Sequence, residues 1–252
     1  EGADLRRARS LLAQDLDTAE ELGGTFFRAL KIQVAGPLTL AAMVERPRGD
    51  KMLADHGARR EIAESLAEGL RTHIADVRRR FSGANIVVQV DEPSIVAVMT
   101  GGIPTASGFG RHRSVQPPEA DALLRMITSS ITDAGARPVM HSCAPDLPVE
   151  LLAGAGFAAI SFDLGLAKPA DVWAETFEQG VDLWVGVVPS LDARVSDAEI
   201  ASMIETFFSQ LGFDGDAYAD RLVVTPTCGM AGASPGWART AWTRASKALS
   251  VP

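Results

Sequence analysis

Six short runs of apolar residues recur along the chain, and longer stretches with a helical pattern separate them. Each run is about five residues long and almost uninterrupted, which is typical of strands buried on both faces of a parallel sheet. The predicted strands span residues 31–35, 86–90, 138–141, 158–163, 183–188 and 222–225.

The stretches between these runs carry the periodicity of amphipathic helices. From Ile62 to Phe81 the apolar residues recur every three or four positions, so they share one face of a helix. The sequence Ser196-x-x-Glu199 is a capping box that marks the start of a later helix. The predicted helices span residues 4–22, 62–81, 117–135, 196–211 and 237–249. Strands and helices in alternation predict parallel strands joined by right-handed crossovers.

Two architectures accommodate this order, an open doubly wound sheet and a closed (β/α)8 barrel. No glycine-rich dinucleotide motif or P-loop follows any strand run, which argues against a nucleotide-binding open sheet. We therefore predict the α/β class; both architectures stay open at this point, and a (β/α)8 TIM barrel is the one that the family resemblance described below implies. Six strand runs are two short of a closed barrel, and the chain opens in a helical pattern. We expect residues 1–252 to form a single barrel domain that is N-terminally incomplete and lacks its first two strands.

Composition narrows the class of protein. The 252 residues include 24 Lys and Arg against 32 Asp and Glu, a net charge of −8 that argues against a general nucleic-acid binder. No window approaches about 18 consecutive apolar residues, and the N-terminus lacks the apolar core of a signal peptide. Two cysteines do not make a disulfide framework. We expect a cytoplasmic protein with neither a nucleic-acid nor a membrane partner.

Side chains that ligate metals gather at the carboxyl ends of the predicted strands. His141 and Cys143 stand two residues apart, so they share a face if the strand continues, and Asp163 and Cys228 end or follow later strands. In a barrel these ends meet at one rim, where the four side chains would form a mixed nitrogen, sulfur and oxygen site for zinc. Taken singly, the cysteines equally suit small buried positions, and the histidine suits a hydrogen-bonded structural position.

Three further residues lie at the same predicted rim. Asp91 and Glu92 end the second strand, where either would hold a substrate ammonium group or act as an acid–base. A helix cap or an ion pair at the rim fits this pair equally well. Gly36 ends the first strand, where the missing side chain either lets a ligand approach the backbone or simply permits a turn.

The order of these motifs resembles the catalytic C-terminal barrel of the cobalamin-independent methionine synthase family, especially its short single-barrel members. The resemblance covers about residues 31–230. It rests on Gly-Pro-Leu-Thr at 36–39, Gln-Val-Asp-Glu-Pro-Ser at 89–94, His-x-Cys at 141–143, a carboxylate 22 residues after the histidine, and Thr-Cys-Gly at 227–229.

The resemblance implies a zinc-dependent methyltransferase that acts on a thiol, most simply homocysteine, to give methionine. It implies that Asp91 holds the substrate amino group, and that the zinc ligands are His141, Cys143, Asp163 and Cys228. Asp163 stands where the family has glutamate. Residues 186–190 contain no histidine, although the long members have one in the corresponding stretch. These departures argue against folate as the methyl donor and leave a corrinoid protein as an alternative.

Other functions stay open at this point. A decarboxylase resembling uroporphyrinogen decarboxylase, or a coenzyme-M-type methyltransferase, belongs to the same wider superfamily. A non-catalytic binding barrel whose site has decayed is a third interpretation, because Asp163 and the missing histidine would both allow it.

Overall fold

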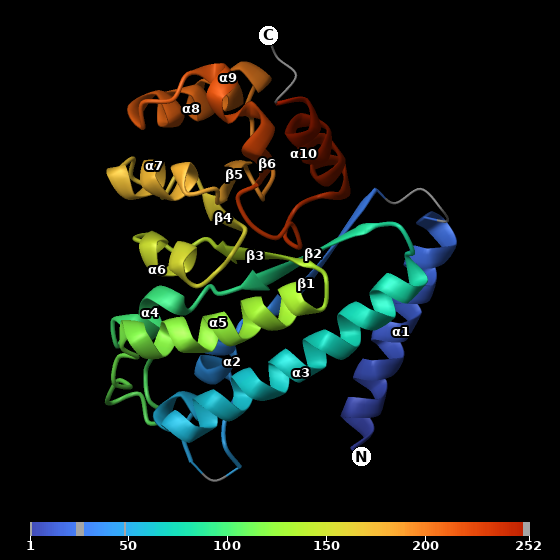
Figure 1. Cartoon of the computed structure of the whole chain (residues 1–252), viewed down its shortest axis with the longest axis vertical. Helices are drawn as coiled ribbons and strands as arrows, with labels where there is room; N and C mark the ends of the chain where they lie inside the picture. Colours follow the sequence, from blue (N-terminus) through green and yellow to red (C-terminus); the bar gives the residue numbers. More distant parts are fainter. Residues whose placement is uncertain (1, 24–27, 48, 249–252) are drawn as a thin grey trace.

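The computed structural model describes residues 2–23, 28–47 and 49–248, and a sheet of six parallel strands forms its centre (Figure 1). The strands hydrogen-bond in chain order, each parallel to the next. Every predicted strand is confirmed, with bounds that move by no more than two residues. The strands are β1 (Ala29–Ala35), β2 (Asn85–Asp91), β3 (Arg137–Ser142), β4 (Ala159–Asp163), β5 (Asp182–Val188) and β6 (Leu222–Pro226).

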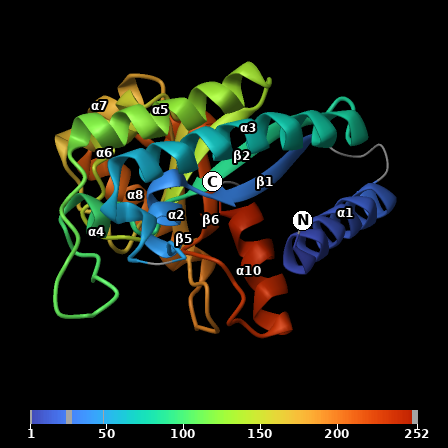
Figure 2. The same ribbon diagram turned by 90° about the horizontal axis from the view of Figure 1, so that it is seen from below.

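Helices follow the strands, and most of them cover one face of the sheet (Figures 1 and 2). The stripe predicted from Ile62 onward is buried against this face at Leu70, Ile74 and Val77. The helices are α1 (Ala3–Gly23), α2 (Pro37–Met43), α3 (His56–Arg80), α4 (Ile95–Met99), α5 (Pro117–Asp133), α6 (Val149–Gly154), α7 (Asp171–Glu178), α8 (Asp197–Gln210), α9 (Gly215–Tyr218) and α10 (Pro235–Lys247), with short 3-10 turns η1 (Met52–Ala54) and η2 (Ala219–Arg221).

The sheet curls like part of a barrel wall. Within the described residues it does not close, so β1 and β6 each pair with a neighbour on one side only. The α/β barrel-type fold is therefore confirmed as a six-stranded half-barrel, and the closed eight-stranded form stays a prediction. No helix in the described part of the chain has both the length and the apolar character needed to cross a membrane.

The two faces of the sheet differ in polarity. Outward residues such as Val88 and Val90 are fully buried in the main core beneath the helices. The inner face carries only a small apolar cluster, which Val139, Ala159 and Trp184 form. Because successive residues of a strand point to opposite faces, the remaining inner positions are free to carry polar side chains.

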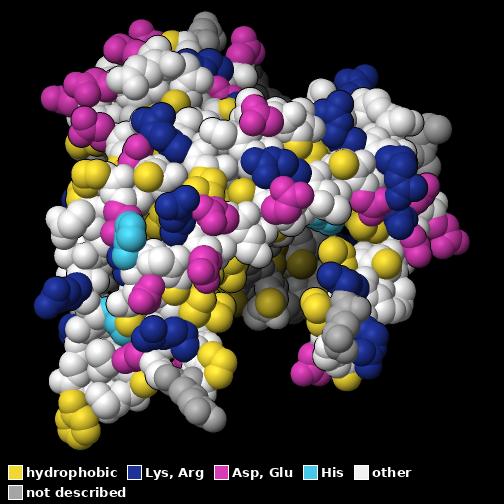
Figure 3. All heavy atoms as spheres, turned by 60° about the horizontal axis from the view of Figure 1, so that its bottom comes forward, with side chains coloured by type: hydrophobic (Ala, Val, Ile, Leu, Met, Phe, Trp, Pro, Cys, Tyr) yellow, Lys and Arg dark blue, Asp and Glu magenta, His cyan; other side chains and the backbone are white. Residues whose placement is uncertain are grey.

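The face of the molecule drawn in Figure 3 mixes both signs of charge. Figure 3 shows a deeply hollowed face on which Lys and Arg side chains are interspersed with Asp and Glu side chains. On this face the acidic side chains are therefore not gathered into one patch, although the chain has a net charge of −8.

Candidate metal centre and its cavity

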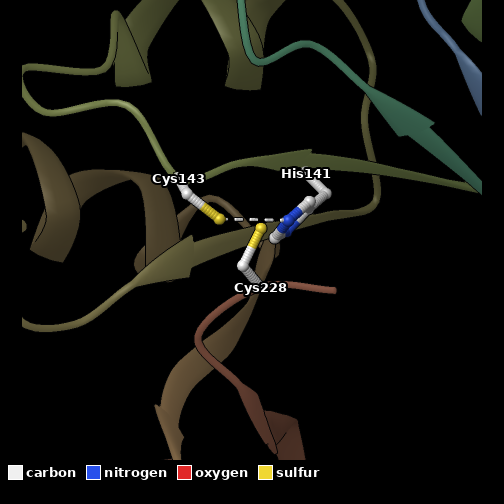
Figure 4. A group of neighbouring side chains, drawn as sticks. All are labelled: His141, Cys143 and Cys228. Atoms are coloured by element: carbon white, nitrogen blue, oxygen red, sulfur yellow. Dashed lines mark hydrogen bonds between the residues drawn. The ribbon is translucent and has the colours of Figure 1, made fainter. Parts of the chain in front are cut away.

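Three side chains bring metal-ligating atoms to one point at the carboxyl end of the sheet (Figure 4). His141 lies in β3, Cys143 follows directly after β3, and Cys228 follows β6. One ligand atom from each of these residues lies within 4.8 Å of the other two. The structure thus brings together three of the four zinc ligands that the resemblance implies.

The imidazole of His141 is oriented by a hydroxyl on the next strand. Its Nδ1 lies 3.0 Å from the Oγ of Ser161, and its Nε2 lies 3.3 Å from the Sγ of Cys143. Burial lowers the pKa of His141, although the negative charge of Asp91 opposes this. A neutral imidazole with one nitrogen held and the other directed at sulfur is the form that binds a metal ion.

The thiol of Cys143 lies where its ionised form is disfavoured. Cys143 is half-buried and lies 2.9 Å from the carbonyl oxygen of Thr227, while Cys228 is exposed. Burial first, and then the neighbouring Cys228, raise the pKa of Cys143 to about 12. A divalent cation would supply the positive charge that stabilises a thiolate here. One imidazole and two sulfurs are a donor set that suits zinc, so these residues fit that ion.

Asp163, the fourth implied ligand, stands slightly apart. It ends β4, and its Oδ1 accepts a hydrogen bond of 2.9 Å from the backbone N–H of Gly165. It does not belong to the group whose ligand atoms lie within 4.8 Å of one another. Ligation by Asp163 therefore stays a prediction.

A cavity of about 430 Å³ opens beside the three ligands. Its walls include Asp91, His141, Cys143 and Cys228. Asp91 pairs in register with His141 on the adjacent strand, which puts its carboxylate on the same inner face. The predicted rim thus holds a negative charge next to the candidate metal ligands.

Glu92 points away from this cavity. Its carboxylate is fully buried and accepts hydrogen bonds from the backbone N–H groups of Leu38 and Thr39, at 2.9 and 2.8 Å, and from the Thr39 hydroxyl at 2.7 Å. These are N–H groups of the first turn of α2, which a carboxylate caps well. The sequence allowed a helix cap as one role for this pair of carboxylates, and Glu92 has that role. A contact between Glu92 and a substrate gains no support.

Gly36 makes room for that cap. A Cβ atom at this position would come within 2.2 Å of the Oε1 of Glu92. Among the described residues Gly36 does not line the cavity, so its predicted role in substrate binding gains no support either.

Two site residues escaped the sequence analysis. Ser161 holds the imidazole of His141, and Gln89 lies 2.7 Å from Asp91. Each stands two residues before a carboxylate on the same strand, so the period of two along a strand was the signal that would have placed them on the inner face.

Gly186 offers a test of how closely the Cys228 segment must pack. A Cβ atom there would lie 2.8 Å from the carbonyl oxygen of Phe162 and 2.8 Å from the Cα of Thr227. Because both are backbone atoms, Gly186→Ala should displace the segment next to Cys228 and weaken zinc binding about tenfold or more. Competition with a chromophoric chelator measures this. Gly229→Ala is the matched control, since a Cβ there meets no atom within 4 Å apart from its two neighbours in the chain. Equal affinities of the two variants would contradict the prediction.

Comparisons with known proteins identify the family of the chain. A family model described as the catalytic domain of cobalamin-independent synthase matches residues 22–250. A methyltransferase from Methanosarcina mazei is similar in structure, with a TM-score of 0.59 and 16% identity over 93% of this chain and 61% of that one. The chain therefore spans less than two thirds of that methyltransferase, and at this identity the likeness shows the fold alone.

A second solved structure is more distant. It is a 2,3-dimethylmalate lyase of the PEP mutase/isocitrate lyase superfamily, with a TM-score of 0.33 and 15% identity over 94% of this chain and 87% of that one. A comparison with curated proteins finds no significant match.

Proposed function

Because the chain belongs to the family of cobalamin-independent synthase catalytic domains, we propose that it transfers a methyl group to the thiol of homocysteine, giving methionine. The observation that carries this proposal is the convergence of His141, Cys143 and Cys228 within 4.8 Å, beside a carboxylate in one cavity. Zinc bound by these residues would let an acceptor thiol react as a thiolate at neutral pH.

The residues in and near the cavity would have different roles in binding the acceptor. The carboxylate of Asp91 would accept hydrogen bonds from the substrate ammonium group, while Ser161 keeps His141 turned toward the sulfurs. Asp163, at the end of β4, is proposed as a further ligand. The cavity of about 430 Å³ is large enough for a small amino-acid thiol.

The choice of methyl donor rests on the end of β5 and the residues after it. Residues 186–190 read Gly-Val-Val-Pro-Ser, so no imidazole is available there to protonate a departing folate. We therefore propose a corrinoid donor in preference to folate.

A transfer assay tests the function directly. Zinc-loaded protein is incubated with homocysteine and either methylcobalamin or 5-methyltetrahydrofolate, and methionine is measured by mass spectrometry. We expect methionine with the corrinoid and none with the folate. Turnover with the folate alone would overturn the donor assignment. Protein that holds about one zinc per chain yet makes no methionine from either donor would overturn the function and favour a non-catalytic barrel.

A further inference from the structure

A line of three hydrogen-bonded side chains crosses the inner face of the sheet below the metal centre. The ammonium of Lys31 on β1 donates to the Oε1 of Gln89 on β2 at 2.9 Å. The Nε2 of Gln89 then donates to the Oδ1 of Asp91 at 2.7 Å. Lys31 is exposed on the open side of the half-barrel, whereas Gln89 is only 9% exposed.

These two contacts fix which way round the Gln89 amide lies. Lys31 can only donate, and an ionised carboxylate can only accept. A flipped amide would turn its oxygen toward Asp91 and its NH2 group toward Lys31, so both contacts would become repulsive. The amide is therefore held with its donors toward Asp91.

The arrangement leaves one carboxylate oxygen available. The Oδ1 of Asp91 accepts from Gln89, while its Oδ2 has no hydrogen-bond partner among the described residues. Asp91 lines the same cavity as Cys143 and Cys228, so a ligand there can reach that oxygen. A carboxylate held at one oxygen also loses less side-chain freedom when the other oxygen binds a cation.

We propose that Gln89 is a positioning residue, anchored by Lys31, which orients Asp91 so that the site selects thiols bearing an amino group. The selectivity comes from the ammonium group of the ligand and not from its sulfur. This inference rests on the proposed function, because it takes the acceptor to be an amino-acid thiol.

Two ligands distinguish the contribution of the amino group to binding from that of the thiol. Homocysteine and 4-mercaptobutanoate share the chain, the thiol and the carboxylate, and differ only in the amino group. Calorimetric titration of the zinc-loaded protein with each ligand gives the two dissociation constants. We expect Gln89→Met to weaken homocysteine binding about tenfold while leaving 4-mercaptobutanoate binding unchanged.

Three further variants complete the test. Lys31→Met should weaken homocysteine binding in the same direction but less, about threefold, and Lys31→Arg should restore it because a guanidinium can still donate to Gln89. Gln179→Met is the control, since Gln179 is exposed at the C-terminal end of α7 and does not line the cavity. Its variant should leave both dissociation constants as they are.

The outcomes separate this inference from the function on which it rests. If the unaltered protein does not prefer homocysteine, or if Asp91→Asn keeps that preference, then the proposed acceptor or its contact with Asp91 is wrong. If the unaltered protein prefers homocysteine and Gln89→Met retains the full preference, then the positioning role is wrong. Equal weakening of both ligands by Gln89→Met would also overturn it, because that result would reflect a general structural defect.

Discussion

Replacing Cys143 or Cys228 by serine is expected to lower bound zinc from about one ion per chain to almost none. A serine hydroxyl stays protonated at neutral pH and is a poor zinc ligand, so one imidazole and one sulfur would remain. Elemental analysis after dialysis against a weak chelator measures the metal content. Full zinc content in Cys143→Ser would remove the basis of the proposed site.

Two substitutions near the site give zinc losses to compare with those of the cysteine variants. Asp163→Asn should lower zinc content only if Asp163 is itself a ligand, because asparagine keeps the size of the side chain and removes its charge. Ser161→Ala leaves the three converging ligands in place and frees the Nδ1 of His141. It should therefore reduce zinc affinity about tenfold without abolishing binding.

The free energy of unfolding of the metal-free protein is expected to decrease as the pH rises from about 4.5 to about 7, because of Glu92. Burial raises the pKa of Glu92 from its ordinary 4.5 to about 7, although the donors of Thr39 and Leu38 oppose this. The folded state then retains a proton that the unfolded chain has released. The stabilisation is therefore complete below pH 4.5 and is lost as the pH rises through 7. The shift corresponds to about 3 kcal/mol.

Urea denaturation at a series of pH values, with excess chelator present, measures this contribution. Glu92→Gln cannot titrate, so the difference between its profile and that of the unaltered protein isolates Glu92. The variant should show a flatter profile in this pH range. Parallel profiles would mean that Glu92 keeps its ordinary pKa despite complete burial.

The strands and the shared rim could be predicted because they depend on local patterns. A run such as 86–90 is apolar at four of its five positions, which is typical of a strand in a parallel sheet. Parallel strands bring their carboxyl ends to one edge, which places His141, Cys143 and Cys228 together whatever their separation in the chain. Short helices such as α4 and α6 escaped prediction because five or six residues hold too little periodicity.

The roles of Asp91 and Glu92 could not be separated from the sequence. Neighbouring residues on a strand face opposite sides, so one of the two had to leave the cavity, but the pattern alone did not say which. The partners of Glu92 lie on α2, more than fifty positions earlier in the chain. Only the folded structure shows that Gly36 leaves room for Glu92 and so turns Asp91 inward.

The placement of the cysteines also determines how the protein responds to oxidants and alkylating reagents. The chain has two cysteines, and both lie in the candidate metal centre. All of its thiol reactivity is therefore located at one point, and no other cysteine contributes background. The rate at which a thiol reagent modifies the chain is thus a direct measure of how accessible this centre is.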